Sequence, residues 1–143
     1  MKKLLVLALV LIIPTFSNAE DKKEEKHEYK IITAEELKSA LESENKPLLI
    51  DSRSAKYLGD GTIIKGAVVK TTDELTKEFL QENTKEGQNI VFYCSNVNCP
   101  ASKHSAHKAI ELGFKNIQKY PGGIDEWKEK KFPTDKIEIA KSK

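Results

Sequence analysis

The 143-residue sequence predicts an α/β domain of three layers, in which helices flank a central, mostly parallel sheet. From residue 29 onward, short β-like runs alternate with helical ones, and this alternation indicates a parallel sheet covered on both faces. The length fits one ordinary domain, and the 38% hydrophobic and 32% charged residues are normal for a soluble globular chain. No internal repeat or low-complexity segment competes with this interpretation.

In the first half of the domain, strands are predicted at residues 29–32, 48–51 and 66–69. Two Thr-x-x-Glu capping boxes, at Thr33 and Thr71, each predict the start of a helix. The first helix continues to about residue 43 with one apolar face. The second leads into Leu75, Phe79 and Leu80 at helical spacing.

In the second half, residues 89–93 give the most continuous β signal, which ends at Cys94. A helix is predicted from about residue 101 to 112, stopped by Gly113, and a last strand at residues 116–120. A turn at residues 122–123 opens a final helix that holds Trp127. We expect Trp127 and Tyr93 to belong to the core. The predicted domain covers residues 29–133, and residues 134–143 are interpreted as a peripheral basic tail.

The N-terminus has the pattern of a cleaved signal peptide over residues 1–19. Two lysines precede ten apolar residues, a run too short to span a bilayer comfortably, and Ser17-x-Ala19 predicts cleavage after Ala19. Residues 20–28 are charged and are interpreted as a solvated linker. We therefore expect a periplasmic or secreted protein with no stable membrane anchor after cleavage.

The charge of the predicted mature chain bears on which classes of molecule it can bind. After residue 19 the chain holds 22 basic and 22 acidic side chains, so the mature domain is formally neutral. Such a surface offers no long-range attraction to a nucleic acid backbone, and we expect no nucleic acid partner.

Two cysteines allow one disulfide at most, which excludes a disulfide-stapled miniprotein.

Cys94 stands where a buried strand turns into a helix. The first N–H groups of a helix lack intrahelical partners, and together with the helix dipole they stabilise a thiolate. The same groups would hold an anionic sulfur species such as thiosulfate or a persulfide. The alternative from local sequence alone is a half-buried structural cysteine.

Four segments between residues 32 and 133 carry a resemblance to a known family: LLIDSR at residues 48–53, GTIIKGA at 61–67, VFYC at 91–94, and the closing segment with LGFKNI at 112–117, GGIDEW at 122–127 and FP at 132–133. In this order and spacing the chain resembles the rhodanese (sulfurtransferase) domain family.

The resemblance implies a small α/β domain whose cysteine carries sulfane sulfur as a persulfide. Carried over residue by residue, it makes Cys94 the nucleophile and Asp51 and Arg53 supporting residues. The implied substrate cradle is formed by Ser95, Asn96, Val97, Asn98, Cys99, Pro100, Ala101 and Ser102. The implied partners are a small sulfur-containing anion as donor and a thiol acceptor, and no cofactor is implied.

The loop differs from the family pattern in three ways. Seven residues rather than five lie between Cys94 and Ser102, which predicts a wider or differently shaped pocket. The loop has no arginine, so a thiosulfate dianion would rely on backbone dipoles. Phosphatase-like relatives need an arginine six residues after the cysteine, and Pro100 stands there. Phosphatase or arsenate reductase activity is therefore not expected.

Arg53 is the only arginine among 24 basic residues. A lysine-biased sequence that places one arginine here suggests that the planar guanidinium fork is needed. We expect Arg53 to pair with a carboxylate or with carbonyls and so to fix the loop region rather than to react. The alternative is an ordinary surface arginine.

Cys99 follows Cys94 within the same loop, close enough for the thiols to meet if the loop folds back. It is interpreted as a resolving thiol that closes a disulfide onto an oxidised or persulfidated Cys94. The alternatives are a structural bridge, which would leave the domain without transferase activity, and an inert thiol. His104 and His107 extend the pattern toward metal-ligand spacing, but exposed helical histidines are favoured and no metal site is predicted.

The sequence thus predicts a secreted, single-domain sulfurtransferase centred on Cys94, with thiosulfate or polysulfide as donor and a thiol or cyanide as acceptor. One alternative is a non-catalytic rhodanese-like module for binding or sulfur delivery. The other is a thiol–disulfide redox protein that uses Cys94 and Cys99.

Overall fold

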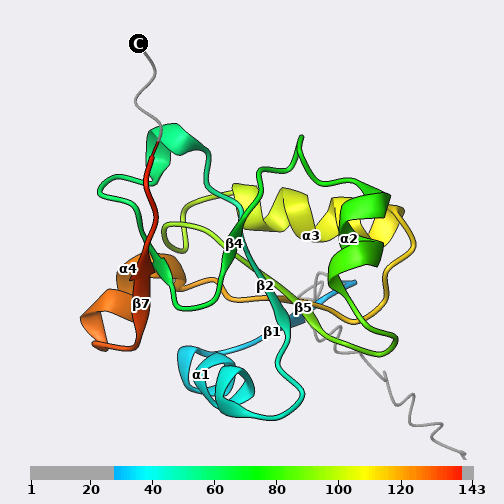
Figure 1. Ribbon diagram of the computed structural model, residues 1–143, viewed down its shortest axis with the longest axis horizontal. Coiled ribbons are helices and arrows are strands. Elements are labelled where there is room, and N and C mark those ends of the chain that lie inside the picture. Colours follow the sequence, from blue (N-terminus) through cyan, green and yellow to red (C-terminus); the bar gives the residue numbers. More distant parts are fainter. Residues whose placement is uncertain (1–27, 140–143) are drawn as a thin grey trace, which may run out of the picture.

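A five-stranded parallel sheet runs through the centre of the domain, as the sequence predicts (Figure 1). The structure, a computed structural model, describes residues 28–139. In spatial order the strands are β1 (Lys30–Ile31), β6 (Ile117–Lys119), β5 (Ile90–Tyr93), β2 (Leu48–Asp51) and β4 (Val68–Val69). Every neighbouring pair in this sheet is parallel.

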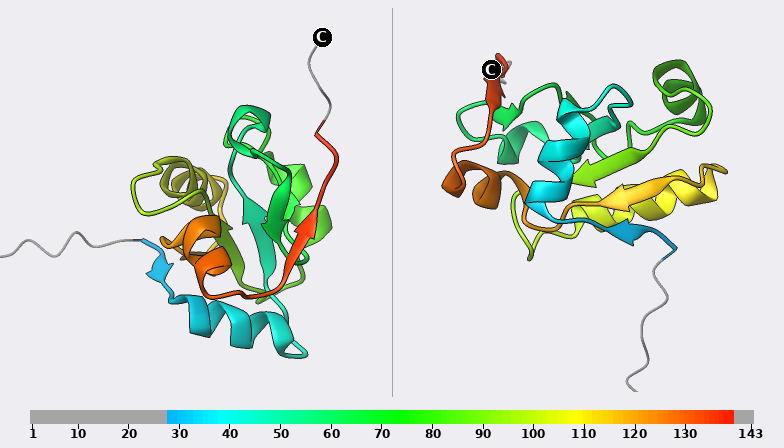
Figure 2. Two further views of the ribbon diagram at one scale, coloured as in Figure 1. Left: turned by 90° about the vertical axis from the view of Figure 1, so that its left-hand side faces the viewer. Right: turned by 90° about the horizontal axis from the view of Figure 1, so that it is seen from below.

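Four α-helices cover the two faces of the sheet and complete the predicted three layers. They are α1 (Ala34–Glu42), α2 (Lys77–Asn83), α3 (Ala101–Glu111) and α4 (Gly123–Glu129). In the left view of Figure 2, α1 (cyan) lies below the strands, whereas α3 (olive) lies beside them at the left. The chain alternates strand and helix because only covered faces can bury the apolar residues of a parallel sheet.

Alternation along β2 and β5 divides the interior into two cores. Leu49 and Val91 pack with Leu37 of α1 and Trp127 of α4. The intervening strand residues Ile50, Ile90 and Phe92 point the other way. They pack with Leu80 of α2 and with Ala106 and Ala109 of α3. Both strands are therefore buried on both faces, and Trp127 and Tyr93 are core residues, as expected.

The first capping box is present as predicted. Thr33 accepts a hydrogen bond from the Glu36 amide, and the Glu36 carboxylate accepts one from the Thr33 amide. The second prediction is wrong, because no helix begins at Thr71. Glu74 accepts hydrogen bonds from the amide and hydroxyl of Thr71 within a turn, and α2 begins only at Lys77, capped by the Thr76 side chain.

A second, two-stranded sheet lies outside the main one. β3 (Thr62–Ile64) pairs antiparallel with β7 (Thr134–Lys136), and a short 3₁₀ helix, η1 (Ala55–Tyr57), precedes β3. The first residues of the segment interpreted as a peripheral tail therefore form an exposed strand of the fold, because a partner strand seventy residues earlier supplies their hydrogen bonds.

The predicted signal peptide at residues 1–19 and residues 20–27 of the predicted linker lie outside the described residues. Within residues 28–139, no helix is both long enough and apolar enough to cross a bilayer. Both predictions about the N-terminus stay predictions.

Candidate active site

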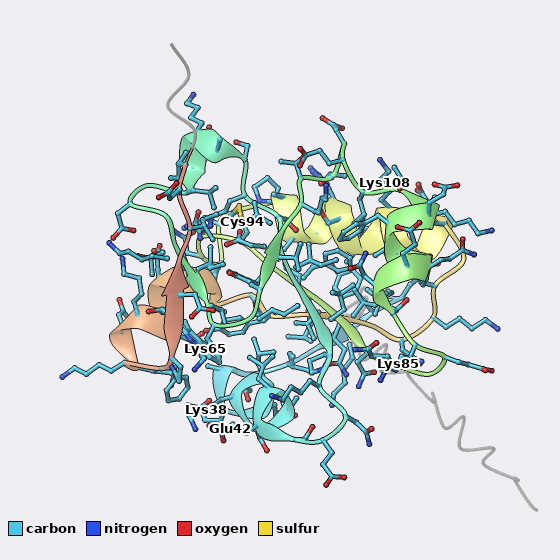
Figure 3. All side chains as sticks on the ribbon, viewed as in Figure 1. Lys38, Glu42, Lys65, Lys85, Cys94 and Lys108 are labelled. Atoms are coloured by element: carbon cyan, nitrogen blue, oxygen red, sulfur yellow. A yellow bond between two sulfur atoms is a disulfide. The ribbon has the colours of Figure 1, made fainter. Side chains whose placement is uncertain are left out.

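Cys94 lies at the carboxyl end of β5, next to the end of β2. The register of these strands pairs Asp51 with Tyr93, and the Ser52 amide donates a 2.9 Å hydrogen bond to the Tyr93 carbonyl. The chains of β2 and β5 therefore leave the sheet side by side, which brings the two predicted site segments together. Figure 3 shows Cys94 beside the N-terminal end of α3.

A disulfide joins Cys94 to Cys99 in this structure, so the loop folds back as the spacing allowed. The two Cα atoms lie 6.2 Å apart. Two local hydrogen bonds shape the loop: the Cys99 amide donates to the Asn96 carbonyl, and the Asn98 amide donates to the Asn96 side chain. Cys94 is 2% exposed, whereas Cys99 is half-buried.

The N-terminal turn of α4 fastens the other side of the loop. The amides of Ile124 and Asp125 donate 3.0 Å hydrogen bonds to the carbonyls of Cys94 and Ser95, respectively. This close approach requires Gly123, which has a φ of +65° and where an added Cβ would lie 2.5 Å from both carbonyl oxygens. Hydrogen bonds from α4 thus hold the backbone around Cys94 in addition to the disulfide.

Asp51 and Arg53 form a buried ion pair under the loop. The Arg53 guanidinium donates to both Asp51 oxygens, with the shortest contact 2.6 Å from Nη2 to Oδ2. It also donates to the Thr62 carbonyl at 2.8 Å and to the Tyr57 carbonyl at 3.4 Å. Arg53 therefore binds a carboxylate and two carbonyls, as expected, and fastens the 54–62 segment to the end of β2.

Burial and neighbouring charge shift the pKa values of Arg53 and of its neighbour Tyr93. Burial alone would lower the pKa of Arg53, but hydrogen bonds and Coulombic attraction from Asp51 outweigh it, so its pKa is raised. Burial first and the Asp51 charge second raise the pKa of Tyr93, which stays protonated and accepts a hydrogen bond from the Ile64 amide. Arg53 and Tyr93 therefore hold the site in place and are unsuited to exchanging protons.

A cavity of about 960 Å³ opens over the disulfide. Fifteen residues from three segments, 52–57, 71–73 and 94–104, line it: Ser52, Arg53, Ser54, Tyr57, Thr71, Thr72, Asp73, Cys94, Ser95, Asn96, Asn98, Cys99, Pro100, Ala101 and His104. Six of the eight predicted cradle residues are among them. Val97 instead is 69% exposed, and Ser102 is buried in the first turn of α3.

Ser52 is a polar group in this cavity that the sequence reasoning missed. Its side chain is buried, and its hydroxyl is the one buried side-chain donor or acceptor within residues 28–139 that has no hydrogen-bond partner. An unpaired buried hydroxyl destabilises a fold unless something in the site bonds to it. Ser52 lines the same cavity as Cys94, so this unpaired hydroxyl belongs to the wall of the candidate site.

The N-terminal end of α3 also faces the cavity, through Pro100 and Ala101. Pro100 is the N-cap residue and no side chain caps the helix, so the amides of its first turn have no intrahelical partner. Such amides favour negative charge. The cavity therefore combines a sulfur atom, a hydroxyl and helix amides without a free arginine.

The segment after β4 contributes Thr71, Thr72 and Asp73, which the sequence reasoning also missed. Their signal was available, because β4 is parallel to β2 and its carboxyl end must lie at the same edge of the sheet.

The two histidines of α3 lie in different surroundings. His104 lines the cavity, whereas the ring of His107 packs edge-on against Tyr29, with the ring centroids 5.3 Å apart. Within residues 28–139 no three His, Cys, Asp or Glu side chains cluster in a way that could hold a metal ion.

Comparisons with known proteins agree on the fold. A comparison with curated proteins gives no match. Among solved structures, a protein from Bacillus halodurans superimposes with a TM-score of 0.66 at 19% identity, covering 80% of this chain and 85% of that one. The rhodanese-like domain from an Anabaena protein gives 0.61 at 22% identity, covering 78% and 82%.

A protein from Rhodopseudomonas palustris, named as a possible tyrosine phosphatase, gives a TM-score of 0.57 at 20% identity, covering 75% of this chain and 85% of that one. At such identities these likenesses establish the fold alone. The sequence pattern of the Rhodanese-like domain matches residues 33–130, which is more than half of the chain. With the fold and the cysteine loop as described, this chain belongs to the Rhodanese-like domain family.

Proposed function

We propose that this protein is an exported sulfurtransferase that carries sulfane sulfur as a persulfide on Cys94. The observation that carries the proposal is the placement of the Cys94 sulfur at a strand end, in a large cavity that also receives the first turn of α3. Sulfur transfer is one activity of the family, and a reactive cysteine beside the N-terminal end of a helix suits this reaction.

In the proposed reaction the reduced Cys94 thiolate attacks the sulfane sulfur of thiosulfate or of a polysulfide. A bond forms between Cys94 Sγ and that sulfur, and sulfite or a shortened polysulfide leaves. The helix amides and the Ser52 hydroxyl stabilise the negative charge on the donor and on the bound persulfide. A thiol or cyanide then removes the outer sulfur and regenerates the thiolate.

The disulfide is the oxidised form of this site, and the reaction requires its reduction. A protein delivered outside the cytosol meets oxidants, so this form is expected to accumulate there. A thiol reductant opens the bridge and exposes the nucleophile. The proposal therefore predicts sulfur transfer only after reduction.

A second candidate function rests on the same disulfide: a thiol–disulfide redox protein in which both cysteines are required. A third, the non-catalytic binding or sulfur-delivery module, needs neither cysteine. In contrast, the phosphatase reaction requires a phosphate-binding arginine, and Arg53 already uses its guanidinium on Asp51. We therefore favour sulfur transfer over phosphoryl chemistry.

Intact-mass spectrometry tests the proposal. The protein is reduced, freed of reductant and exposed separately to thiosulfate and to inorganic polysulfide. We expect Cys99→Ser to gain the mass of one sulfur atom, mapped to Cys94, and Cys94→Ser to gain nothing. A thiol–disulfide redox protein would lose its redox activity in either variant. If Cys99→Ser gains no sulfur from either donor, the proposal is overturned.

A further inference from the structure

Cys99 lies where a second reaction on the Cys94 persulfide would take place. The two sulfur atoms are bonded in the structure, and Cys99 lines the cavity that holds Cys94. The turn closed by the Cys99 amide and the Asn96 carbonyl keeps the second cysteine near the first. The side chain of Asn96 is itself held by Asp125 at 2.8 Å. The loop is thus fastened in a form that brings one thiol onto the other.

We propose that Cys99 is the internal thiol acceptor of this site and converts the bound sulfane sulfur to sulfide. This inference rests on the proposed function, since it requires a persulfide on Cys94. The Cys99 thiolate attacks Sγ of Cys94, the inner sulfur of the persulfide. The Cys94–Cys99 disulfide forms, the bond between Cys94 Sγ and the outer sulfur breaks, and hydrosulfide leaves.

The step balances in atoms and electrons. The two thiols are together oxidised by two electrons, and the sulfane sulfur accepts them as it becomes sulfide. With thiosulfate as donor, the dithiol protein yields the disulfide protein, sulfite, hydrosulfide and one proton. A dithiol reductant then restores both thiols for another turnover. The structure corresponds to the product of the sulfide-releasing step.

Attack on the inner sulfur follows from which atoms the fold brings together. The disulfide bond joins Cys99 to Cys94 Sγ itself, with the Cα atoms 6.2 Å apart, inside the usual range for bridged cysteines. The outer sulfur would lie beyond Cys94 Sγ in the cavity of about 960 Å³, where the leaving hydrosulfide has room to depart. The fold thus favours the reaction that closes the bridge over one that only moves the sulfur to Cys99.

Proximity gives Cys99 an advantage over external acceptors. For equal intrinsic reactivity, an internal thiol at an effective concentration on the order of 1 mM reacts about tenfold faster than cyanide supplied at about 0.1 mM. We therefore expect sulfide rather than thiocyanate to be the main product of the wild-type protein under those conditions. Removing Cys99 should reverse this preference.

A single-turnover experiment tests the inference. Reduced wild-type protein, freed of reductant, receives whichever donor loads the Cys99→Ser variant. We expect one sulfide per chain above the Cys94→Ser background, together with a protein mass lower by two hydrogen atoms. Cys99→Ser should keep its persulfide, release no sulfide, and form about tenfold more thiocyanate than the wild type at about 0.1 mM cyanide.

Val97→Ser is the matched control, because the structure places Val97 outside the cavity with its side chain 69% exposed. The change puts a serine in the same loop and keeps both thiols. It should behave as the wild type does. A stable persulfide on wild-type Cys94 without sulfide, or a persulfide mapped to Cys99, would overturn the inference while the proposed function stands. No loading of Cys99→Ser by either donor would overturn the proposed function, and the inference with it.

Discussion

The buried pair of Asp51 and Arg53 allows a quantitative test of how the wall of the cavity is held. Asp51 is fully buried and Arg53 is 5% exposed. In Arg53→Met the side chain keeps an extended apolar stem but loses its charge and its donors. The Asp51 carboxylate then stays buried without its cation, and the Thr62 carbonyl loses the 2.8 Å hydrogen bond that ties β3 to β2.

Removing one partner of a buried ion pair lowers the free energy of unfolding by about 3–5 kcal/mol, because the remaining charge has no compensation. Arg53→Lys keeps the charge but replaces the fork by one ammonium group. It loses at least one charge-assisted hydrogen bond, which contributes about 1.5–3 kcal/mol. We therefore expect Arg53→Met to be the less stable variant. The double variant with Asp51→Asn should recover part of the loss, since no buried charge is left unpaired.

Urea denaturation followed by circular dichroism measures these differences. Lys85→Met serves as the control, because it removes a charge from an exposed loop that lies away from Cys94 (Figure 3). It should change stability by no more than about 0.5 kcal/mol. If Arg53→Met is as stable as Lys85→Met, the ion pair does not hold the cavity wall and the reasoning is wrong.

Three further predictions concern the loop. Gly123→Ala forces a Cβ against the carbonyls of Cys94 and Ser95 at a positive φ. It should destabilise the protein by about 1–3 kcal/mol in thermal unfolding and reduce persulfide loading. Unchanged stability and loading would contradict the docking of α4 on the loop. Ser52→Ala removes an unpaired hydroxyl, so the free energy of unfolding should stay within about 1 kcal/mol of the wild type or rise. KM for the sulfur donor should increase by a larger factor than kcat falls. An unchanged KM would exclude Ser52 from donor binding. Reduction of the disulfide should lower stability by only about 2 kcal/mol, since the loop it closes is short; complete unfolding on reduction would instead indicate a structural bridge.

The strand that ends at Cys94 could be predicted because its signal is local. Residues 90–93 are continuously apolar, and the helix after Pro100 ends at a glycine that permits a positive φ. The capping box at Thr33 is equally local. The similar motif at Thr71 misled the prediction because its hydrogen bonds satisfy a turn as well as a helix. Deciding between them required the helix-capping contact of Thr76, five residues further along the chain.

The small sheet could not be predicted from the sequence because its pairing is not local. Residues 134–136 are all exposed and carry no apolar alternation, so nothing in their own pattern marks a strand. Their hydrogen bonds come from β3, about seventy residues earlier. The unpaired hydroxyl of Ser52 was likewise beyond the sequence, since any Ser after a strand has the same local signal and only the packed interior leaves this one without a partner.

The pairing of β7 with β3 makes the cavity sensitive to fraying at the end of the domain. β7 is exposed and short, and such edge segments open locally at lower free energy than the core strands. When β7 detaches, β3 loses its only partner strand within residues 28–139. This affects the cavity because the Thr62 carbonyl of β3 accepts a hydrogen bond from Arg53. Amide hydrogen exchange at residues 62–64 should therefore follow the opening of β7. A tag or truncation placed just after Pro133 should disturb a site that lies far away along the sequence.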